Sequence, residues 1–493
     1  MKTLTKSLNK IICAFGILLP LVSSILVLNG EISPLPLAAI FFGLILYFIY
    51  SNRSRLLPII HCRTSCVLLW GIVIFAILAR TYPLLTGMDY ICQNDLSDTG
   101  VHYYAAQELF FGGLEPNIVS YEKVYPFLMP YTVTLSCFNY LLNGHINLAI
   151  IVSNTCFDLL GCLFCYLALR HFSLRTAKIG AFLWIVNPFS IVMCWLPLNI
   201  VVVNMLLSAA FYSAVLFFSA FHRKKQYRFV LAGLFGLAVF AANTFRPVFT
   251  VFMIAFVLTM FLTEFENNKK DTLIAIVVAI LLMAIPTGIL HCIVKNTFGE
   301  DLLSGCGGWN FYVGSNYDSY GQWTREDCDH FFGEVLWAQT FSPTEAHKII
   351  KQEAVQRYLQ LMPAQLINHF ANKASVLFSR SNGMAYDLGY ALGLSGDRFL
   401  YRVISSCISL CFGALTLISS LWMVRSSKRN KNIFFTLCYM GLFAAFLLVE
   451  VMNRYSSVFY AMFVFYAAFQ LTKWFSFSAS EKNTVEVDCL EDV

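Results

Sequence analysis

Residues 199–221, NIVVVNMLLSAAFYSAVLFFSAF, carry no charged side chain. An apolar run of about 20 residues is long enough to cross the hydrocarbon core of a bilayer as one helix. Similar runs recur along the chain of 493 residues, which is 58% hydrophobic and only 13% charged. Because soluble proteins carry roughly 25% charged residues, the sequence predicts an all-α polytopic membrane protein.

The same pattern predicts about twelve transmembrane helices, which are separated by polar loops. Loops that are rich in Lys and Arg mark the cytoplasmic side of such a protein. The candidate spans are 11–29, 36–51, 67–84, 147–169, 179–196, 199–221, 229–245, 247–263, 272–294, 400–424, 433–449 and 455–474.

All the basic loops fall on one side of the membrane if a further apolar segment, 126–142, does not cross it. Pro126 and Pro130 at its start favour a re-entrant or juxtamembrane helix over a straight span. We therefore expect both termini in the cytoplasm. We interpret the net charge of +6 as topology rather than nucleic-acid binding. The basic loops are centred on Lys6, Arg55, Arg175, Lys224, Lys269 and Lys428.

This topology divides the chain into five parts, two of which carry large outward loops. The parts are accessory helices 1–66, a core at 67–294, an extracytoplasmic loop at 295–399, the last helices at 400–474 and a cytoplasmic tail at 475–493.

The first outward loop, 85–146, contains the stretch 92–113, CQNDLSDTGVHYYAAQELFFGG. Asp98 directly precedes a helical pattern, so its carboxylate suits a helix N-cap and a general base equally. Asp95 lies just upstream as a second carboxylate. For the remaining acidic residues of this loop we expect solvated surface positions, namely for Asp89, Glu115 and Glu122.

The long outward loop opens with a patch rich in Gly, Asn, Ser and aromatic residues, 307–323. Glycines let a backbone approach a ligand closely, and aromatic rings stack on sugar faces. The patch therefore suits a carbohydrate site, and an ordinary turn-rich loop is the alternative. Side chains that match sugar or acceptor hydroxyls are Asn310, Tyr312 and Asn316.

Later in this loop the pattern becomes helical, from Ser342 to about Phe378. Pro343 suits the first helical position after an N-cap serine, so we expect a small helical subdomain here. Cys306 and Cys328 both lie in the outward loop, and a disulfide between them is left open.

Three arginines fall near the outer ends of predicted spans: Arg80, Arg246 and Arg454. A charge at membrane depth is costly and is a functional hypothesis by default. Arginine matches a phosphate group with two parallel hydrogen bonds, so these residues are candidates for binding a phosphate. Snorkelling to lipid headgroups is the alternative for each of them.

Together these features resemble GT-C glycosyltransferases of the protein O-mannosyltransferase and aminoarabinose-transferase kind. The run from Asp98 through His102-Tyr103-Tyr104-Ala105-Ala106 to Gly112 is similar to the first-loop signature of that family, and Tyr125-Pro126 to the segment that follows it. The patch 308–323 is similar to a long-loop motif, and Asn453-Arg454-Tyr455 to the start of a late helix. The resemblance covers about residues 67–474.

The resemblance implies inverting transfer of a sugar, which we expect to be a hexose, from a polyprenyl-phosphate donor at the extracytoplasmic face. The acceptor is a hydroxyl of a glycolipid, a wall polymer or a protein. Asp98 is then the general base with Asp95 beside it, and Arg454, Arg246 and Arg80 bind the donor phosphate. The expected substrate ligands are His102, Tyr104, Asn310, Tyr312 and Asn316.

One departure from the family concerns the first loop, where several members place Asp and Glu side by side. Here Thr99 follows Asp98, which leaves open whether Asp95 shares the work and whether a divalent cation is bound. No metal ligand or other cofactor is predicted. Two other functions stay as alternatives: a transporter or flippase of lipid-linked sugars, and a polysaccharide polymerase or ligase.

Overall fold

The computed structural model describes residues 65–86, 98–113, 122–221, 227–298, 307–379, 411–423 and 433–477. Every regular element within these ranges is a helix, in agreement with the predicted all-α class. The expected spans 11–29 and 36–51, the tail after residue 477 and Asp95 lie outside the described residues.

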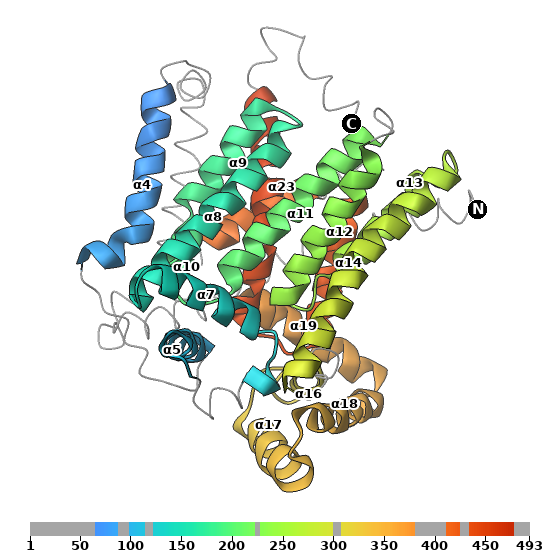
Figure 1. Ribbon diagram of the computed structural model, residues 1–493. Helices are drawn as coiled ribbons and strands as arrows, with labels where there is room; N and C mark the ends of the chain where they lie inside the picture. The colour runs from blue at the N-terminus through green and yellow to red at the C-terminus, as the bar shows by residue number, and fades with distance from the viewer. Residues whose placement is uncertain are drawn as a thin grey trace.

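A bundle of apolar helices forms the larger part of the molecule (Figure 1). Four of them, α8, α11, α12 and α14, are long and apolar enough to cross a membrane. The bundle contains α4 (Ser65–Thr86), α8 (Ile146–Arg170), α9 (Leu174–Val186), α10 (Pro188–Met193), α11 (Ile200–Ala220), α12 (Arg228–Phe245), α13 (Thr250–Thr263), α14 (Lys269–Phe298), the helix Cys411–Met423, α22 (Ile433–Leu448) and α23 (Tyr460–Phe477).

Most helix ends match the expected spans, but two spans are built differently. The segment predicted as one span at 179–196 is divided into α9 and α10 at Asn187-Pro188, because proline cannot continue the hydrogen-bond ladder of a helix interior. The last span begins as a 3₁₀ helix, η4 (Asn453–Phe459), before it continues as α23.

Helix α23 lies at the centre of the bundle, where every residue from Val458 to Phe469 is buried. A helix that is apolar on all sides has no face to present to water, so it packs inside. Small residues bring other helices close together: a Cβ built on Gly236 of α12 would lie 2.2 Å from the carbonyl oxygen of Ala279 on α14. A glycine is required there because the two backbones leave no room for a side chain.

The helices of the two outward loops gather at one end of the bundle, the lower end in Figure 1. We call it the loop end. Helix α7 has 13 residues, or about 20 Å at 1.5 Å per residue, which is too short to cross a bilayer by itself. The elements are α5 (Asp98–Phe111), α7 (Met129–Leu141), α16 (Gly308–Gly314), α17 (Arg325–Cys328), the π-helix η1 (Asp329–Thr340), α18 (Pro343–Gln360) and α19 (Pro363–Ser379).

The expected start of the helical subdomain is confirmed at α18. Ser342 is the N-cap, and its hydroxyl accepts a hydrogen bond of 3.4 Å from the backbone N–H of Glu345. Pro343 occupies the first helical position, where its missing N–H has no cost. A second helix, α19, begins at Pro363 after a break at Leu361.

A buried ion pair joins α4 to the rest of the bundle. The guanidinium of Arg80 lies 2.7 Å from the carboxylate of Asp158 on α8 and also donates to the hydroxyl of Ser190 on α10. Trp184 on α9 donates to the other carboxylate oxygen of Asp158 at 2.9 Å. Four helices therefore meet at one pair of charges, neither of which is exposed to water.

We predict that Asp158→Asn destabilises the protein by about 3–5 kcal/mol, because it leaves the charge of Arg80 buried without a counter-ion. The free energy of unfolding, measured in detergent with urea, is the test. Asp329→Asn is the matched control, since the ion pair of Asp329 with Arg325 is 3.7 Å long and exposed on both sides. Equal effects of the two substitutions would contradict this role of the buried pair.

Candidate active site

A second hydrophobic core, separate from that of the bundle, joins the two outward loops. It contains Val124 from the first loop together with Trp309, Val313 and Phe331 from the long loop. The segment around Val124 is therefore part of the folded subdomain of the long loop. This position determines where the neighbouring residues Glu122 and Tyr125 lie.

His347 on α18 connects the two loops by hydrogen bonds at both ring nitrogens. Its Nδ1 accepts from the backbone N–H of Trp309 at 3.1 Å, so Nε2 carries the proton and donates to the carbonyl oxygen of Val124 at 3.0 Å. Burial lowers the pKa of this imidazole to about 4, which keeps the ring neutral. His347 was not among the predicted site residues, because a lone histidine within a helical pattern does not by itself indicate a role.

The turn between α22 and η4 is attached to the long loop through backbone groups. The N–H of Glu450 donates to the carbonyl oxygen of Asn310 at 2.5 Å, and the N–H of Val451 donates to that of Gly321 at 2.9 Å. A Cβ on Gly314 would lie 2.4 Å from the carbonyl carbon of Val449. This glycine thus allows close packing within the protein. We had expected the glycines of the patch 307–323 to let the backbone approach a ligand instead.

Lys373 on α19 is a fully buried lysine next to this turn. Its ammonium group donates to the carbonyl oxygen of Gly314 at 2.7 Å. Burial lowers the pKa of Lys373 to about 7, although the charge of Glu450 acts in the opposite direction. His369 of α19 bonds to the same oxygen at 2.9 Å, so two buried ionisable groups attach α19 to α16.

Five side chains from three separate parts of the chain meet at the turn between α22 and η4, and we call them the loop-end cluster. They are Asp98, Tyr125, Arg246, Glu450 and Tyr455. Burial raises the pKa of the Tyr125 phenol well above its ordinary value, and the charges of Glu450 and Asp98 raise it further. The Tyr455 hydroxyl donates to Glu450 at 3.4 Å, and the Arg246 guanidinium stacks over the Tyr455 ring at 4.3 Å.

Among the three predicted phosphate ligands, Arg246 lies in the loop-end cluster. Arg454 follows Asn453 in η4 and directly precedes Tyr455, so its backbone lies at the same place. Arg80 does not: its side chain is fully buried within the bundle and paired with Asp158. The expectation that Arg80 faces the outer interface is corrected, because an acidic partner on α8 was not anticipated.

The first-loop residues lie where α5 packs on α7. Asp98 is the first residue of α5 and is half-buried. His102 is 1% exposed, with its Nδ1 2.9 Å from the Thr132 hydroxyl and its ring against the edge of Tyr131. Tyr104 is half-buried and contacts Tyr103. Of these residues, Asp98 alone adds to the raised pKa of Tyr125.

The predicted long-loop ligands take part in the packing of their own subdomain. The Tyr312 hydroxyl accepts from Arg357, whose guanidinium stacks on the Tyr312 ring. The amide of Asn316 donates to Asp327 at 2.8 Å and also accepts from the backbone N–H of Ser319. Asn310 is half-buried beside Glu450. These contacts support the loop itself and differ from the sugar contacts that we expected.

Glu122 is not a solvated residue as the sequence suggested. It is 5% exposed, it forms a side-chain hydrogen bond with Thr132, and burial raises the pKa of its carboxyl group. The correction has a tertiary cause: the neighbouring Val124 is buried in the core of the long loop, which takes Glu122 inside with it. Whether Cys306 and Cys328 form a disulfide was left open by the sequence, and the question falls outside the described residues because Cys306 does.

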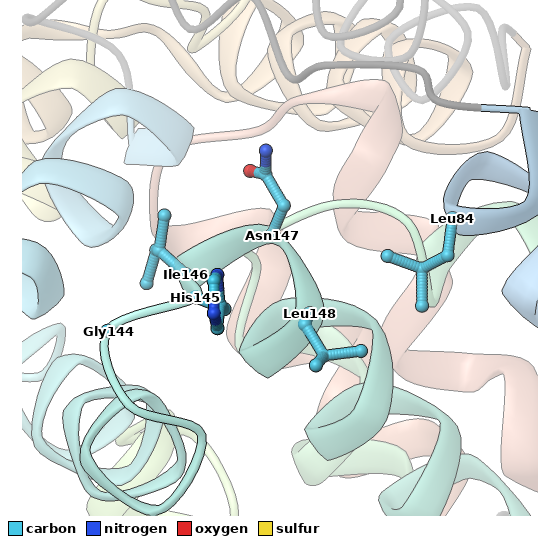
Figure 2. A pocket seen from close by; sticks show the side chains of 6 residues that line it. All are labelled: Leu84, Gly144, His145, Ile146, Asn147 and Leu148. Carbon is cyan, nitrogen blue, oxygen red and sulfur yellow. The ribbon is translucent and has the colours of Figure 1, made fainter.

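A cavity of about 510 Å³ opens between the end of α4 and the start of α8. Figure 2 shows Leu84 of α4 across from Asn147 and Leu148 of α8. Gly144 on its rim packs against Phe110, at the end of α5 away from Asp98. The described part of the chain contains no group of three His, Cys, Asp or Glu residues placed to hold a metal ion.

Among solved structures, the chain is similar to the crystal structure of ArnT from Cupriavidus metallidurans bound to undecaprenyl phosphate. The two chains are 14% identical with a TM-score of 0.41, and the match covers 86% of this chain and 82% of that chain. No protein-family model matches the sequence, and no curated protein does. At this score the likeness supports no statement about what the present chain binds.

We predict that acid weakens the folded protein through His347. Because its pKa is about 4 when folded and about 6.5 when unfolded, the unfolded chain binds an extra proton between these values. Stability therefore falls as the pH drops from about 6.5 to about 4. His347→Phe should lower the melting temperature at pH 7 and reduce this pH dependence.

The matched control is His145→Phe at the exposed start of α8, which should leave the melting temperature and its pH dependence unchanged. Melting curves in detergent between pH 4 and pH 8 provide the measurement. An unchanged slope in His347→Phe would contradict the role of the buried imidazole.

Proposed function

We propose that the protein is a membrane glycosyltransferase that transfers a sugar from a polyprenyl-phosphate donor to a hydroxyl acceptor on the extracytoplasmic face. One observation carries the proposal: Asp98, Arg246 and Tyr455 meet in one cluster although they lie far apart in the sequence. A carboxylate and a cation in one cluster suit a reaction in which a hydroxyl loses a proton and a phosphate leaves.

In the proposed reaction, the acceptor hydroxyl attacks the anomeric carbon on the face opposite the phosphate, which inverts the configuration. Asp98 takes the hydroxyl proton as general base. Asp98 lies half-buried at the first turn of α5. The N-terminus of a helix also stabilises the ionised form of a carboxylate, so Asp98 is available as a base at neutral pH.

The leaving group is polyprenyl phosphate, which gains negative charge as the bond to the sugar breaks. Arg246 provides a positive charge that the Tyr455 ring holds in a fixed orientation. Arg454 contributes a second charge from the neighbouring position in η4. Tyr125 stays protonated because its pKa is raised, so its hydroxyl acts as a hydrogen-bond donor beside the phosphate.

The function is tested with the purified full-length protein in proteoliposomes that contain a polyprenyl-phosphate hexose. Transfer of radiolabelled sugar to an added glycolipid or wall-polymer acceptor supports the proposal. Movement of the intact lipid across the bilayer without transfer would support a flippase instead. Formation of long sugar polymers from the same donor would indicate a polymerase.

We predict that Asp98→Asn lowers the transfer rate by about 10²–10⁴-fold, since the amide cannot accept the hydroxyl proton. The matched control is Asp318→Asn, at an exposed position of the long loop, which should retain the wild-type rate. Initial rates at saturating donor, normalised to the amount of folded protein, provide the comparison. Near-normal transfer by Asp98→Asn would remove Asp98 as the base.

We predict that Arg246→Ala lowers the rate by about 10²-fold, because one fixed charge opposite the leaving phosphate is lost. Arg454→Ala should weaken use of the donor in the same assay. Arg325→Ala removes a guanidinium that is 89% exposed on the long loop and is expected to have no effect. Donor dependence that is unchanged in both variants would indicate arginines that only contact lipid headgroups.

A further inference from the structure

Three polar side chains that the proposed reaction does not use meet in the interior of the loop end. They are Glu122, which lies before α7 in the first loop, Thr132 on α7 and His102 on α5. Thr132 is fully buried, His102 is 1% exposed and Glu122 is 5% exposed. We call them the buried triad. Buried polar groups are costly, so a group of three requires a reason.

Thr132 is the central member of the buried triad. Its hydroxyl forms a side-chain hydrogen bond with the carboxyl group of Glu122, and its oxygen lies 2.9 Å from Nδ1 of His102. The second carboxyl oxygen of Glu122, Oε1, is buried and has no hydrogen-bond partner within the described residues. One end of the triad is thus an under-satisfied carboxyl group.

A threonine hydroxyl has a single proton, so the direction in which Thr132 donates links the protonation state of Glu122 to that of His102. When the Glu122 carboxylate is charged, Thr132 donates to it and must accept from Nδ1–H of His102, so His102 Nε2 is free of a proton. When Glu122 is neutral and donates to Thr132, the hydroxyl proton points to Nδ1, and Nε2 carries the proton. A proton that arrives at Nε2 can therefore end on Glu122.

Helix α5 connects this triad to the candidate base. Asp98 and His102 are four residues apart, a spacing that places both on the same face of a helix. The buried face of α5 packs on α7, which carries Thr132. The base at the start of α5 and the triad behind it therefore share one helix face.

We propose that the buried triad is a proton path that receives the acceptor's proton from Asp98 and stores it on Glu122 while the sugar is transferred. The proposal rests on the proposed function. His102, Thr132 and Glu122 are positioning and proton-storing residues in it, and none of them contacts the substrate. Asp98 then returns to its charged form before the products leave.

The step balances in protons and charge. The O–H bond of the acceptor breaks, its oxygen bonds to the anomeric carbon, and the bond from that carbon to the donor phosphate breaks with its electron pair. The proton passes to Asp98 and then to Nε2 of His102. Nδ1–H is given to Thr132, the Thr132 proton is given to Glu122, and Glu122 becomes a neutral acid. The path resets after the products leave, when Glu122 returns its proton to Thr132, Thr132 gives one to Nδ1 of His102, and Nε2 gives its proton to water.

The direction of transfer follows from the surroundings of each group. Burial raises the pKa of Glu122, so its carboxyl group holds a proton more tightly than an ordinary glutamate does. Other titratable groups lie on the elements packed here. They are Asp98, Tyr103, Tyr104 and Glu108 on α5, Tyr131, Cys137 and Tyr140 on α7, Lys123 and Tyr125 beside Glu122, and His347, which reaches Val124 from α18.

The test compares the pH dependence of transfer in the wild-type protein, Glu122→Gln and Thr132→Val. In the wild type, the rate should fall with acid as Glu122 becomes protonated. Glu122→Gln and Thr132→Val should lower the rate by about 10–10²-fold, less than loss of the base itself, and should move the acidic limb of the profile to lower pH. Thr134→Val is the matched control, because the Thr134 hydroxyl bonds to Pro130 of its own helix.

Infrared spectra of the full-length protein provide a second readout that needs no activity. A protonated carboxyl band should titrate above the range of ordinary glutamate, remain in Asp98→Asn and be absent from Glu122→Gln. A normal profile in both triad variants, or an equal loss of rate at every pH, overturns the proton path. No transfer by the wild-type protein overturns the proposed function, and the path with it.

Discussion

A neutral imidazole is the interaction on which the loop end depends. His347 accepts a hydrogen bond from α16 and donates one to the backbone of the first loop. A protonated ring could not accept the first of these bonds, so the apolar core around His347 and the two hydrogen bonds support each other. Through this connection Tyr125 is brought to Glu450, and Glu122 is brought to Thr132.

The charges of this protein are few, and the buried ones have specific partners. Arg80 is paired with Asp158 inside the bundle, and Lys373 donates to a backbone carbonyl oxygen. An ion that is removed from water is tolerated only with such partners. The guanidinium of Arg246 lies over the face of the Tyr455 ring. This contact holds one positive charge at the loop end, which is the basis for assigning Arg246 to the phosphate in the proposed function.

The loop end also separates carboxylates by their surroundings. Asp98 lies half-buried at the start of α5. Glu122 lies in an apolar interior, where the neutral form is favoured. This difference in burial is the basis of the proposed proton path from Asp98 to Glu122.

The sequence by itself determined the features that depend on local composition. The absence of charge in segments such as 199–221 predicts the apolar helices, and Ser342-Pro343 predicts where α18 begins, because an N-cap and a proline act within one helical turn. Asp98 and Arg246 were also singled out by the sequence, from a helix-start pattern and from a charge between two apolar runs. Only the tertiary structure decided which charges meet. Arg80 pairs with Asp158, Glu122 is buried, and His347 joins the two loops by hydrogen bonds. The sequence could not show these features, because each depends on a partner that lies far away in the chain.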